Sequence, residues 1–321
     1  MPNRTLRVAL TGLAVGVFAA AHADVTVPAY QSGSQWFTDG QSSIQDKSSM
    51  AREDVTAKNV ILFVGDGMGI STLTAARILE GQLAGDEGEE NYLSFESFPY
   101  SALIKTYNTN QQTPDSAGTM TAMMSGVKNK AGMINISSDG VRGDCSSTAG
   151  NELNTFLDLM EDAGRSTGVV STARITHATP AATYARVPER NWESDDSLPE
   201  EARQNGCKDI ADQLASYDVG DGIDVVLGGG RRHFLPEADG GKRQDGRDLI
   251  QLWQERYQDS EQTALYVESG SELATADLAS TDKLMGLFTS SHMSYDADRK
   301  ANAKDEPSVA DMTEAAIDVL S

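Results

Sequence analysis

Short apolar runs recur along the chain and mark its elements. Residues 59–64 form a continuous apolar run, and shorter runs lie at 168–171, 223–227 and 284–288. Hydrophobicity that is continuous rather than alternating is typical of strands buried on both faces, as in a parallel sheet. The pattern therefore predicts a buried strand at each of these places.

Segments with helical spacing of their apolar residues separate the predicted strands. They lie at 70–83, at 153–160 before Gly164, at 209–216 and at 249–253. Strands that alternate with helices predict an α/β fold, a three-layer sandwich whose central, mostly parallel sheet has helices on both faces. In such folds, chemistry gathers outside the carboxyl ends of the strands.

The first residues have the features of a secretory signal. Arg4 and Arg7 form a basic start, residues 8–20 are apolar but short for a bilayer span, and a small-x-small cleavage pattern ends at Ala23. We therefore expect residues 1–23 to be a signal peptide and the protein to be periplasmic or secreted.

An oxidising compartment changes the interpretation of the two cysteines. Cys145 and Cys207 are the only pair in the chain, and export favours a disulfide between them over two free buried thiols. Residues 24–55 are polar and mixed, which predicts an exposed N-terminal arm.

The strongly acidic composition limits the partners of the chain. The formal net charge is −22, and removal of Arg4 and Arg7 with the signal peptide takes it to −24. This charge opposes nucleic acid and anionic membranes as partners, because both are bound through clustered Lys and Arg. A phosphate site would need local positive charge from metal ions, an arginine or a helix N-terminus.

The segment 113–119, Thr-Pro-Asp-Ser-Ala-Gly-Thr, is the strongest candidate for chemistry. Ser116 lies between Asp115 and two small residues, directly before an apolar run. This layout can place a hydroxyl at the first turn of a helix, at the positive end of the helix dipole, as a nucleophile for phosphate. The same residues also fit an ordinary helix N-cap.

Other candidate residues follow predicted strands. Asp66, between two glycines, is a candidate metal ligand or an Asp in a tight turn. His177 and Thr179 are two residues apart, so in an extended segment they face one side and could serve a metal. Arg190 could clamp two phosphate oxygens or form an ordinary surface ion pair. The glycine-rich segment 228–230 lacks the spacing of a phosphate loop, and we interpret it as a structural turn.

Several motifs together resemble one family. Residues 59–69, 114–119, 176–181 and 190–192 occur in the order and form found in the alkaline phosphatase family, which the chain closely resembles from residue 59 onward. Further similar segments are at 125–128, 225–231, 285–288 and 307–316. The resemblance implies an alkaline-phosphatase-like fold and the hydrolysis of small phosphomonoesters through a phosphoserine, with release of inorganic phosphate.

The resemblance also implies roles for individual residues. Ser116 is similar to the nucleophile, and Arg190, oriented by Asp115, is similar to the arginine that holds the phosphate. Asp66, Ser116, His177 and Thr179 match positions at or beside the Zn²⁺ and Mg²⁺ ions of the family. Cys145 and Cys207 resemble a disulfide pair of animal-type members. A homodimer is compatible with this family and stays open.

The resemblance is incomplete in one respect. In the family, the helix similar to 311–321 leads to motifs that supply most zinc ligands and a magnesium glutamate, and this sequence does not contain them. We therefore expect residues 56–321 to be the N-terminal part of a catalytic domain truncated at its C-terminus. Two other functions stay open: a secreted fragment that is inactive and binds metal or phosphate weakly, and a related phosphodiesterase or sulfatase.

Overall fold

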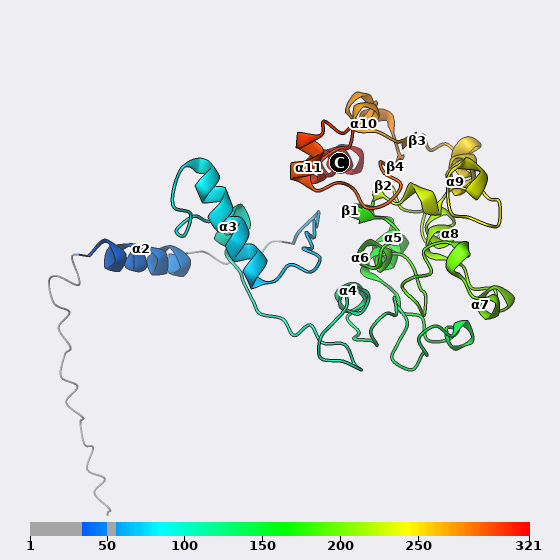
Figure 1. Ribbon diagram of the computed structural model, residues 1–321, viewed down its shortest axis with the longest axis horizontal. Coiled ribbons are helices and arrows are strands. Elements are labelled where there is room, and N and C mark those ends of the chain that lie inside the picture. Colours follow the sequence, from blue (N-terminus) through cyan, green and yellow to red (C-terminus); the bar gives the residue numbers. More distant parts are fainter. Residues whose placement is uncertain (1–33, 50–55) are drawn as a thin grey trace, which may run out of the picture. The chain divides into compact units, whose positions relative to one another are not determined.

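The computed structural model describes residues 34–49 and 56–321. The predicted signal peptide lies outside the described residues, as does part of the predicted N-terminal arm. The described residues divide into two units, which can be followed in Figure 1: one comprises 34–49, 56–62 and Ala76–Ala102, and the other comprises Phe63–Ala75 with Leu103–Ser321. We call them the smaller and the larger unit.

The smaller unit is helical. Helix α2 (Gln35–Ser49) forms the described part of the N-terminal arm and is mostly exposed. Helix α3 (Ile70–Ala84) begins in the larger unit and continues into the smaller one, close to the predicted 70–83. A return segment containing η1 (Ser94–Ser97) is tied to α3 through an Arg77–Glu96 ion pair of 3.5 Å.

The predicted strand at 59–64 is wrong. These residues form no strand, and Val60, Ile61, Leu62 and Phe63 are 58–73% exposed. The physical reason is that burial on both faces requires a sheet around the strand, and no strand of the described sheet pairs with this segment.

A parallel sheet forms the centre of the larger unit. Its strands are β1 (Gly168–Arg174), β2 (Val225–Gly229), β3 (Ala264–Val267) and β4 (Lys283–Leu287), in the order β1-β2-β4-β3. All three ladders are parallel, which confirms the predicted α/β class. Strands were predicted at three of these places, and β3 was not.

Helices begin where the chain supplies caps. Thr155 forms a capping box at the start of α5, Asp209 and Asp248 cap α8 and α9, and Ser308 forms a capping box at α12. The helices of the larger unit, besides the first part of α3, are α4 (Ser116–Ser125), α5 (Phe156–Asp162), α6 (Ala178–Ala181), α7 (Glu200–Gln204), α8 (Ile210–Ala215), α9 (Leu249–Gln258), α10 (Gly270–Thr275), α11 (Asp296–Ala301) and α12 (Val309–Leu320).

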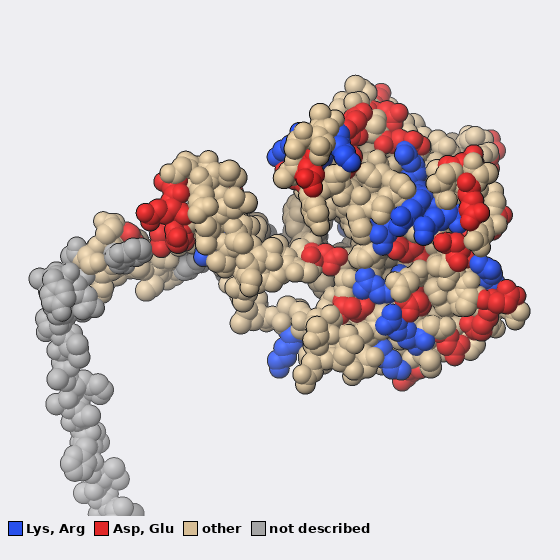
Figure 2. Space-filling model, in the orientation of Figure 1, with Lys and Arg blue, Asp and Glu red and all other residues tan. Residues whose placement is uncertain are grey.

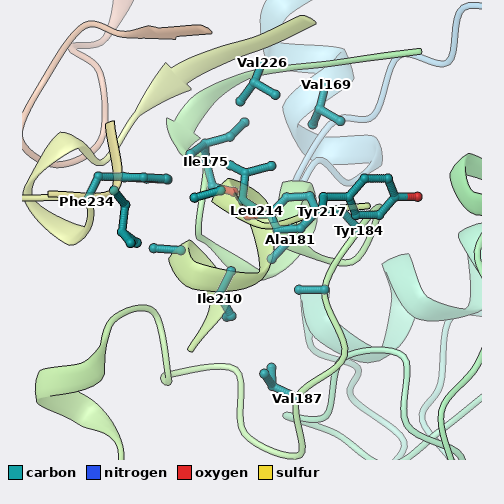
Figure 3. Packing of buried hydrophobic residues seen from close by; sticks show 14 of the residues in the cluster. Val169, Ile175, Ala181, Tyr184, Val187, Ile210, Leu214, Tyr217, Val226 and Phe234 are labelled. Atoms are coloured by element: carbon teal, nitrogen blue, oxygen red, sulfur yellow. Dashed lines mark hydrogen bonds between the residues drawn. The ribbon is translucent and has the colours of Figure 1, made fainter. Parts of the chain in front are cut away.

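The sheet has a hydrophobic core on each face. Val226 and Met285 point into one core, which includes residues of α6, α8 and α9 (Figure 3), while Val225 and Leu284 point into the other, which α12 covers. Neighbouring residues of one strand thus enter opposite cores, as the period of two requires. The helices on both faces confirm the predicted sandwich.

A disulfide and a glycine-rich turn complete the larger unit. Cys145 and Cys207 form a disulfide, as predicted. The predicted structural turn at Gly228–Gly230 is wrong for its first two residues, because Gly228 and Gly229 end strand β2. The chain turns at Gly230, which has φ +96°, and a Cβ on Gly229 would lie 2.2 Å from the Ser291 carbonyl oxygen. Within the described residues, no helix is long and apolar enough to cross a membrane.

Candidate active site

Ser116 is the first residue of helix α4. The cap of this helix is Asp115, whose Oδ1 accepts a 3.0 Å hydrogen bond from the Gly118 amide. The interpretation of Ser116 as the N-cap is therefore wrong, because the preceding carboxylate occupies that role. Ser116 is half-buried at the amino end of a ten-residue helix, where the helix dipole favours an anion.

The two small residues after Ser116 face the interior. Ala117 is fully buried, and a Cβ on Gly118 would lie 1.6 Å from Asn108 Nδ2. They allow α4 to pack closely on Asn108, whose Oδ1 accepts a 3.0 Å hydrogen bond from the Asp115 amide.

Asp115 joins the helix to an arginine. Its Oδ2 accepts hydrogen bonds from the Gly132 amide at 2.9 Å and from Arg190 Nη1 at 3.0 Å. The Arg190 amide in turn donates to the Gly132 carbonyl at 2.8 Å. One carboxylate therefore positions both the N-terminus of α4 and a guanidinium that is separated from it by 75 residues.

A histidine lies on the other side of Arg190. His177 Nε2 is 3.2 Å from Arg190 Nη2, and a guanidinium can only donate, so Nε2 accepts and the ring proton lies on Nδ1. Burial, followed by the positive charges of Arg190 and Arg174, lowers the pKa of His177. The ring is therefore neutral at neutral pH.

Asp66 meets His177 and Thr179 at the same edge of the sheet. Thr179 Oγ1 donates to Asp66 Oδ2 at 2.8 Å, and His177 Nδ1 lies 4.0 Å from the same oxygen. The expected extended segment is wrong, since His177 is the N-cap of α6 and Thr179 lies inside that helix. Asp66 itself follows Gly65 in a turn in which Gly67 has φ +68°.

These residues carry atoms of the kinds that bind metal ions. Asp66 and Thr179 offer oxygen atoms, and His177 Nδ1 is buried without a hydrogen-bond partner in the described structure. In the ring tautomer that Arg190 imposes, Nδ1 carries a proton, so His177 fits a position beside a metal better than one on it. Residues 34–49 and 56–321 contain no cluster of three or more His, Cys, Asp or Glu that could hold a metal ion.

Other residues of the larger unit whose side chains could carry chemistry have structural roles. Arg186 pairs with buried Asp158 and donates to the Leu153 carbonyl at 3.1 Å. In the described part of the chain, the serine that hydrogen-bonds a histidine is Ser194, 2.9 Å from His233 Nδ1, and Ser194 is fully buried. A serine–histidine pair that no substrate can reach does not support a Ser-His-Asp hydrolase.

Sequence reasoning missed the residues that hold this site together. Asn108 and Gly132 contact Asp115, and Arg174, Glu193 and His292 lie beside His177. Glu193 directly follows the 190–192 motif, and this position in the sequence could have indicated that it lies near the site. The others come from separate segments without a motif.

Comparison with known proteins identifies one family. Residues 57–321 match the family model described as alkaline phosphatase. The chain belongs to the alkaline phosphatase family. It is 43% identical over 300 residues to the tissue-nonspecific isozyme of alkaline phosphatase from Mus musculus, covering 90% of this chain and 56% of the relative.

Further relatives and solved structures have the same family name. The chain is 44% identical over 275 residues to an alkaline phosphatase of Gadus morhua, covering 82% of this chain and 56% of that protein. The structure of Thermus thermophilus alkaline phosphatase aligns with a TM-score of 0.60 at 27% identity, over 80% of this chain and 45% of that one. The chain spans about half the length of the curated relatives it matches.

Proposed function

We propose that the protein hydrolyses phosphate monoesters with Ser116 as nucleophile. The observation that carries this proposal is the double role of Asp115, which caps the helix that Ser116 begins and binds Arg190. A hydroxyl, a helix N-terminus and a guanidinium are thereby assembled at one end of α4. Membership of the alkaline phosphatase family supports the same activity.

The reaction has two displacements. Ser116 Oγ attacks phosphorus, the bond from phosphorus to the ester oxygen breaks, and the alcohol leaves with the serine proton. Water then attacks the phosphoserine, which restores the serine and releases inorganic phosphate. Arg190 holds the non-bridging oxygens in both steps, because the negative charge they carry is stabilised by prearranged donors.

Arg190 favours a monoester over a diester or sulfate ester. Nη1 donates to Asp115 and Nη2 to His177, which leaves a second N–H on each terminal nitrogen. Two parallel N–H groups match two free oxygens of a terminal phosphate. A diester also offers two free oxygens, but they share a single negative charge, as do the free oxygens of a sulfate ester. The guanidinium therefore favours the monoester through its higher negative charge.

We propose Zn²⁺ and Mg²⁺ as cofactors, with Asp66, Thr179 and Ser116 as ligands from this chain and His177 beside them. The donor set that meets at Asp66 supports one partial site, and further ligands are required to complete it. When bound, such ions lower the pKa of a serine hydroxyl and stabilise developing negative charge. Asp66 orients Thr179 through their 2.8 Å hydrogen bond.

We also propose that the protein is exported, which the disulfide between Cys145 and Cys207 supports. Partners are small phosphomonoesters, and a homodimer is the assembly to be tested. N-terminal sequencing of protein from an expressing cell checks the export proposal, which predicts that the mature chain begins after Ala23.

The substitution Ser116→Ala tests the function. In protein whose metal site is complete and supplied with Zn²⁺ and Mg²⁺, p-nitrophenyl phosphate should be hydrolysed, and we expect Ser116→Ala to lower turnover by about 10³-fold or more. Ser125→Ala, at the other end of α4, is the matched control and should retain wild-type turnover. An acid quench and mass spectrometry should detect the phosphoserine in the wild type only.

Each alternative has its own result. Unchanged turnover in Ser116→Ala contradicts the proposal. Faster hydrolysis of a diester or sulfate ester than of the monoester assigns a related hydrolase instead. If the wild-type chain shows no turnover but binds inorganic phosphate weakly, the result supports the alternative of an inactive fragment that only binds phosphate.

A further inference from the structure

Three residues outside the family motifs form a chain of contacts that ends at His177. The ring of His292 packs on His177, Arg174 contacts His292, and Glu193 binds Arg174. Arg174 ends β1, Glu193 lies in the segment after Trp192, and His292 follows β4. The His292 and His177 rings pack edge to face, with centroids 5.1 Å apart and an angle of 76° between their planes. Such T-shaped pairs are a preferred aromatic geometry.

Arg174 is held in a fixed orientation. Its Nε donates to Glu193 Oε2 at 2.8 Å and its Nη2 to Glu193 Oε1 at 2.6 Å, a two-point contact that defines the plane of the guanidinium. Glu193 also accepts a 2.7 Å hydrogen bond from the buried Thr176 hydroxyl. Burial opposes ionisation of Glu193, but the hydrogen bonds from Arg174 and Thr176 and the charge of Arg174 lower its pKa to about 2.

The remaining donors of Arg174 face His292. Arg174 Nη1 lies 2.6 Å from His292 Nε2, and the Arg174 amide nitrogen lies 3.2 Å from His292 Nδ1. A neutral imidazole accepts at only one of its two nitrogens, so Arg174 holds the ring through one of these two contacts. His292 is exposed to solvent, so packing alone does not fix its ring, and the hydrogen bond from Arg174 helps to hold it against His177.

The orientation of the His177 ring decides what it offers. With Nε2 toward Arg190, Nδ1–H lies on the side of Asp66, 4.0 Å from Oδ2 and without a hydrogen bond to it. A flip of the ring would place carbon atoms at both positions and leave Arg190 with one partner fewer. Removal of the neighbouring ring frees space for this flip.

We propose that His292 is a positioning residue for His177, held in place by Arg174 and Glu193. Its role in the reaction rests on the proposed function, because His177 in turn orients Arg190. The role acts through the ring of His292 and not through its charge. An aromatic replacement should therefore preserve it.

The test is the tautomer of His177, measured by long-range ¹H–¹⁵N correlation on the chain at about pH 8, where an ordinary histidine is neutral. The sequence has four histidines, so the imidazole signals can be assigned by substitution. We expect a single Nδ1–H form in the wild type and loss of that form, with signals averaged between two tautomers, in His292→Ala. His292→Phe should retain it. Tyr295→Ala, an 83% exposed position in the same segment, is the control and should also retain it.

Each outcome decides the proposal. An unchanged His177 in His292→Ala overturns it, as does an Nε2–H form in the wild type. If His292→Ala does not fold, Arg174→Lys is the second variant, because it removes the two-point contact with Glu193 and keeps the positive charge. We expect averaged His177 signals in Arg174→Lys, and a retained Nδ1–H form overturns the proposal. The proposed function fails separately, through unchanged turnover in Ser116→Ala, and that failure leaves the His177 measurement valid.

Discussion

The two ends of the parallel sheet both gather charged side chains but use them differently. At the carboxyl end, Asp115 and Arg190 form a pair whose guanidinium retains unused N–H groups. At the amino end, Asp224 accepts from the Thr167 amide at 2.7 Å and from Lys283 Nζ at 2.8 Å, so it joins the starts of β1, β2 and β4. The unused N–H groups of Arg190 are available to a ligand. The charged groups of Asp224 and Lys283 instead form their hydrogen bonds within the sheet and hold its strands together.

Burial explains this difference. Lys283 is fully buried, and its remaining contacts are the Gly222 carbonyl at 2.6 Å and Asp221 at 3.3 Å. The side chains of Asp115 and Arg190 are about one-fifth exposed. The surface of the larger unit is also mixed, with basic patches between acidic ones on the face in Figure 2. An overall acidic charge therefore coexists with a local cationic site.

The largest expected effect is on stability, from Lys283→Met. The change removes the positive charge from a buried pair and leaves Asp224 without compensation, which should lower the free energy of unfolding by about 3–5 kcal/mol. Chemical denaturation measures it. Lys300→Met is the control, because Lys300 pairs with Asp296 on the surface with 67% of its side chain exposed, and its loss should cost about 0.5 kcal/mol or less.

A double variant refines this test. Asp224→Asn combined with Lys283→Met removes both charges and should recover part of the lost stability. Equal effects of Lys283→Met and Lys300→Met would show that the amino end of the sheet does not depend on its buried pair.

Arg190→Ala should show the opposite behaviour. Without the guanidinium, we expect turnover of a phosphate monoester to fall by about 10²-fold or more, while the free energy of unfolding changes by about 1 kcal/mol. Steady-state kinetics and denaturation measure the two quantities. Arg165→Ala, which removes an exposed arginine after α5, controls for the loss of one positive charge and should change neither. A large loss of stability in Arg190→Ala would assign Arg190 a structural role and remove the contrast between the two ends.

The sequence predicted both strands inside the sheet and the edge strand β1. It failed where the presence or absence of a neighbouring strand decides whether an apolar run forms a strand. Runs at 223–227 and 284–288 became β2 and β4, which have partners on both sides. The run at 59–64 has the same composition and is exposed, because apolar content indicates a tendency to be buried and supplies no neighbouring strand. Strand β3 forms the edge of the sheet opposite β1, and its four residues are too few to give a clear hydrophobic pattern in the sequence.

The candidate site divides in the same manner. Ser116, Asp115 and Arg190 were found because each lies in a motif, and the structure joins them through direct contacts. The residues that support them, such as Asn108 and His292, are brought in by the fold from distant segments. Their chemistry depends on three-dimensional contacts that spacing along the chain does not encode.

The smallest expected effect, on pH dependence, comes from Glu161 at the amino end of the sheet. Burial raises the pKa of Glu161 to about 7, against an ordinary value of 4.5, although Thr167 donates a hydrogen bond to it. Its Oε2 has no hydrogen-bond partner among the described residues. The folded protein therefore binds this proton more tightly than the unfolded chain does. Between pH 4.5 and about 7, stability from this group falls as pH rises.

Glu161→Gln should remove this pH dependence. The amide has the shape of the protonated acid and cannot ionise, so the variant should match the wild type near about pH 4 and exceed its stability by at most about 3 kcal/mol near about pH 8. Denaturation midpoints across this range measure the difference, with the exposed Glu314→Gln as control. A constant difference between Glu161→Gln and the wild type at every pH would mean that the pKa of Glu161 is the same in the folded and unfolded states, so that Glu161 is ionised in the folded protein at neutral pH. The amino end of the sheet would then hold a buried charge at Glu161 as well. Lys283 alone would then support the difference between the amino end and the carboxyl end.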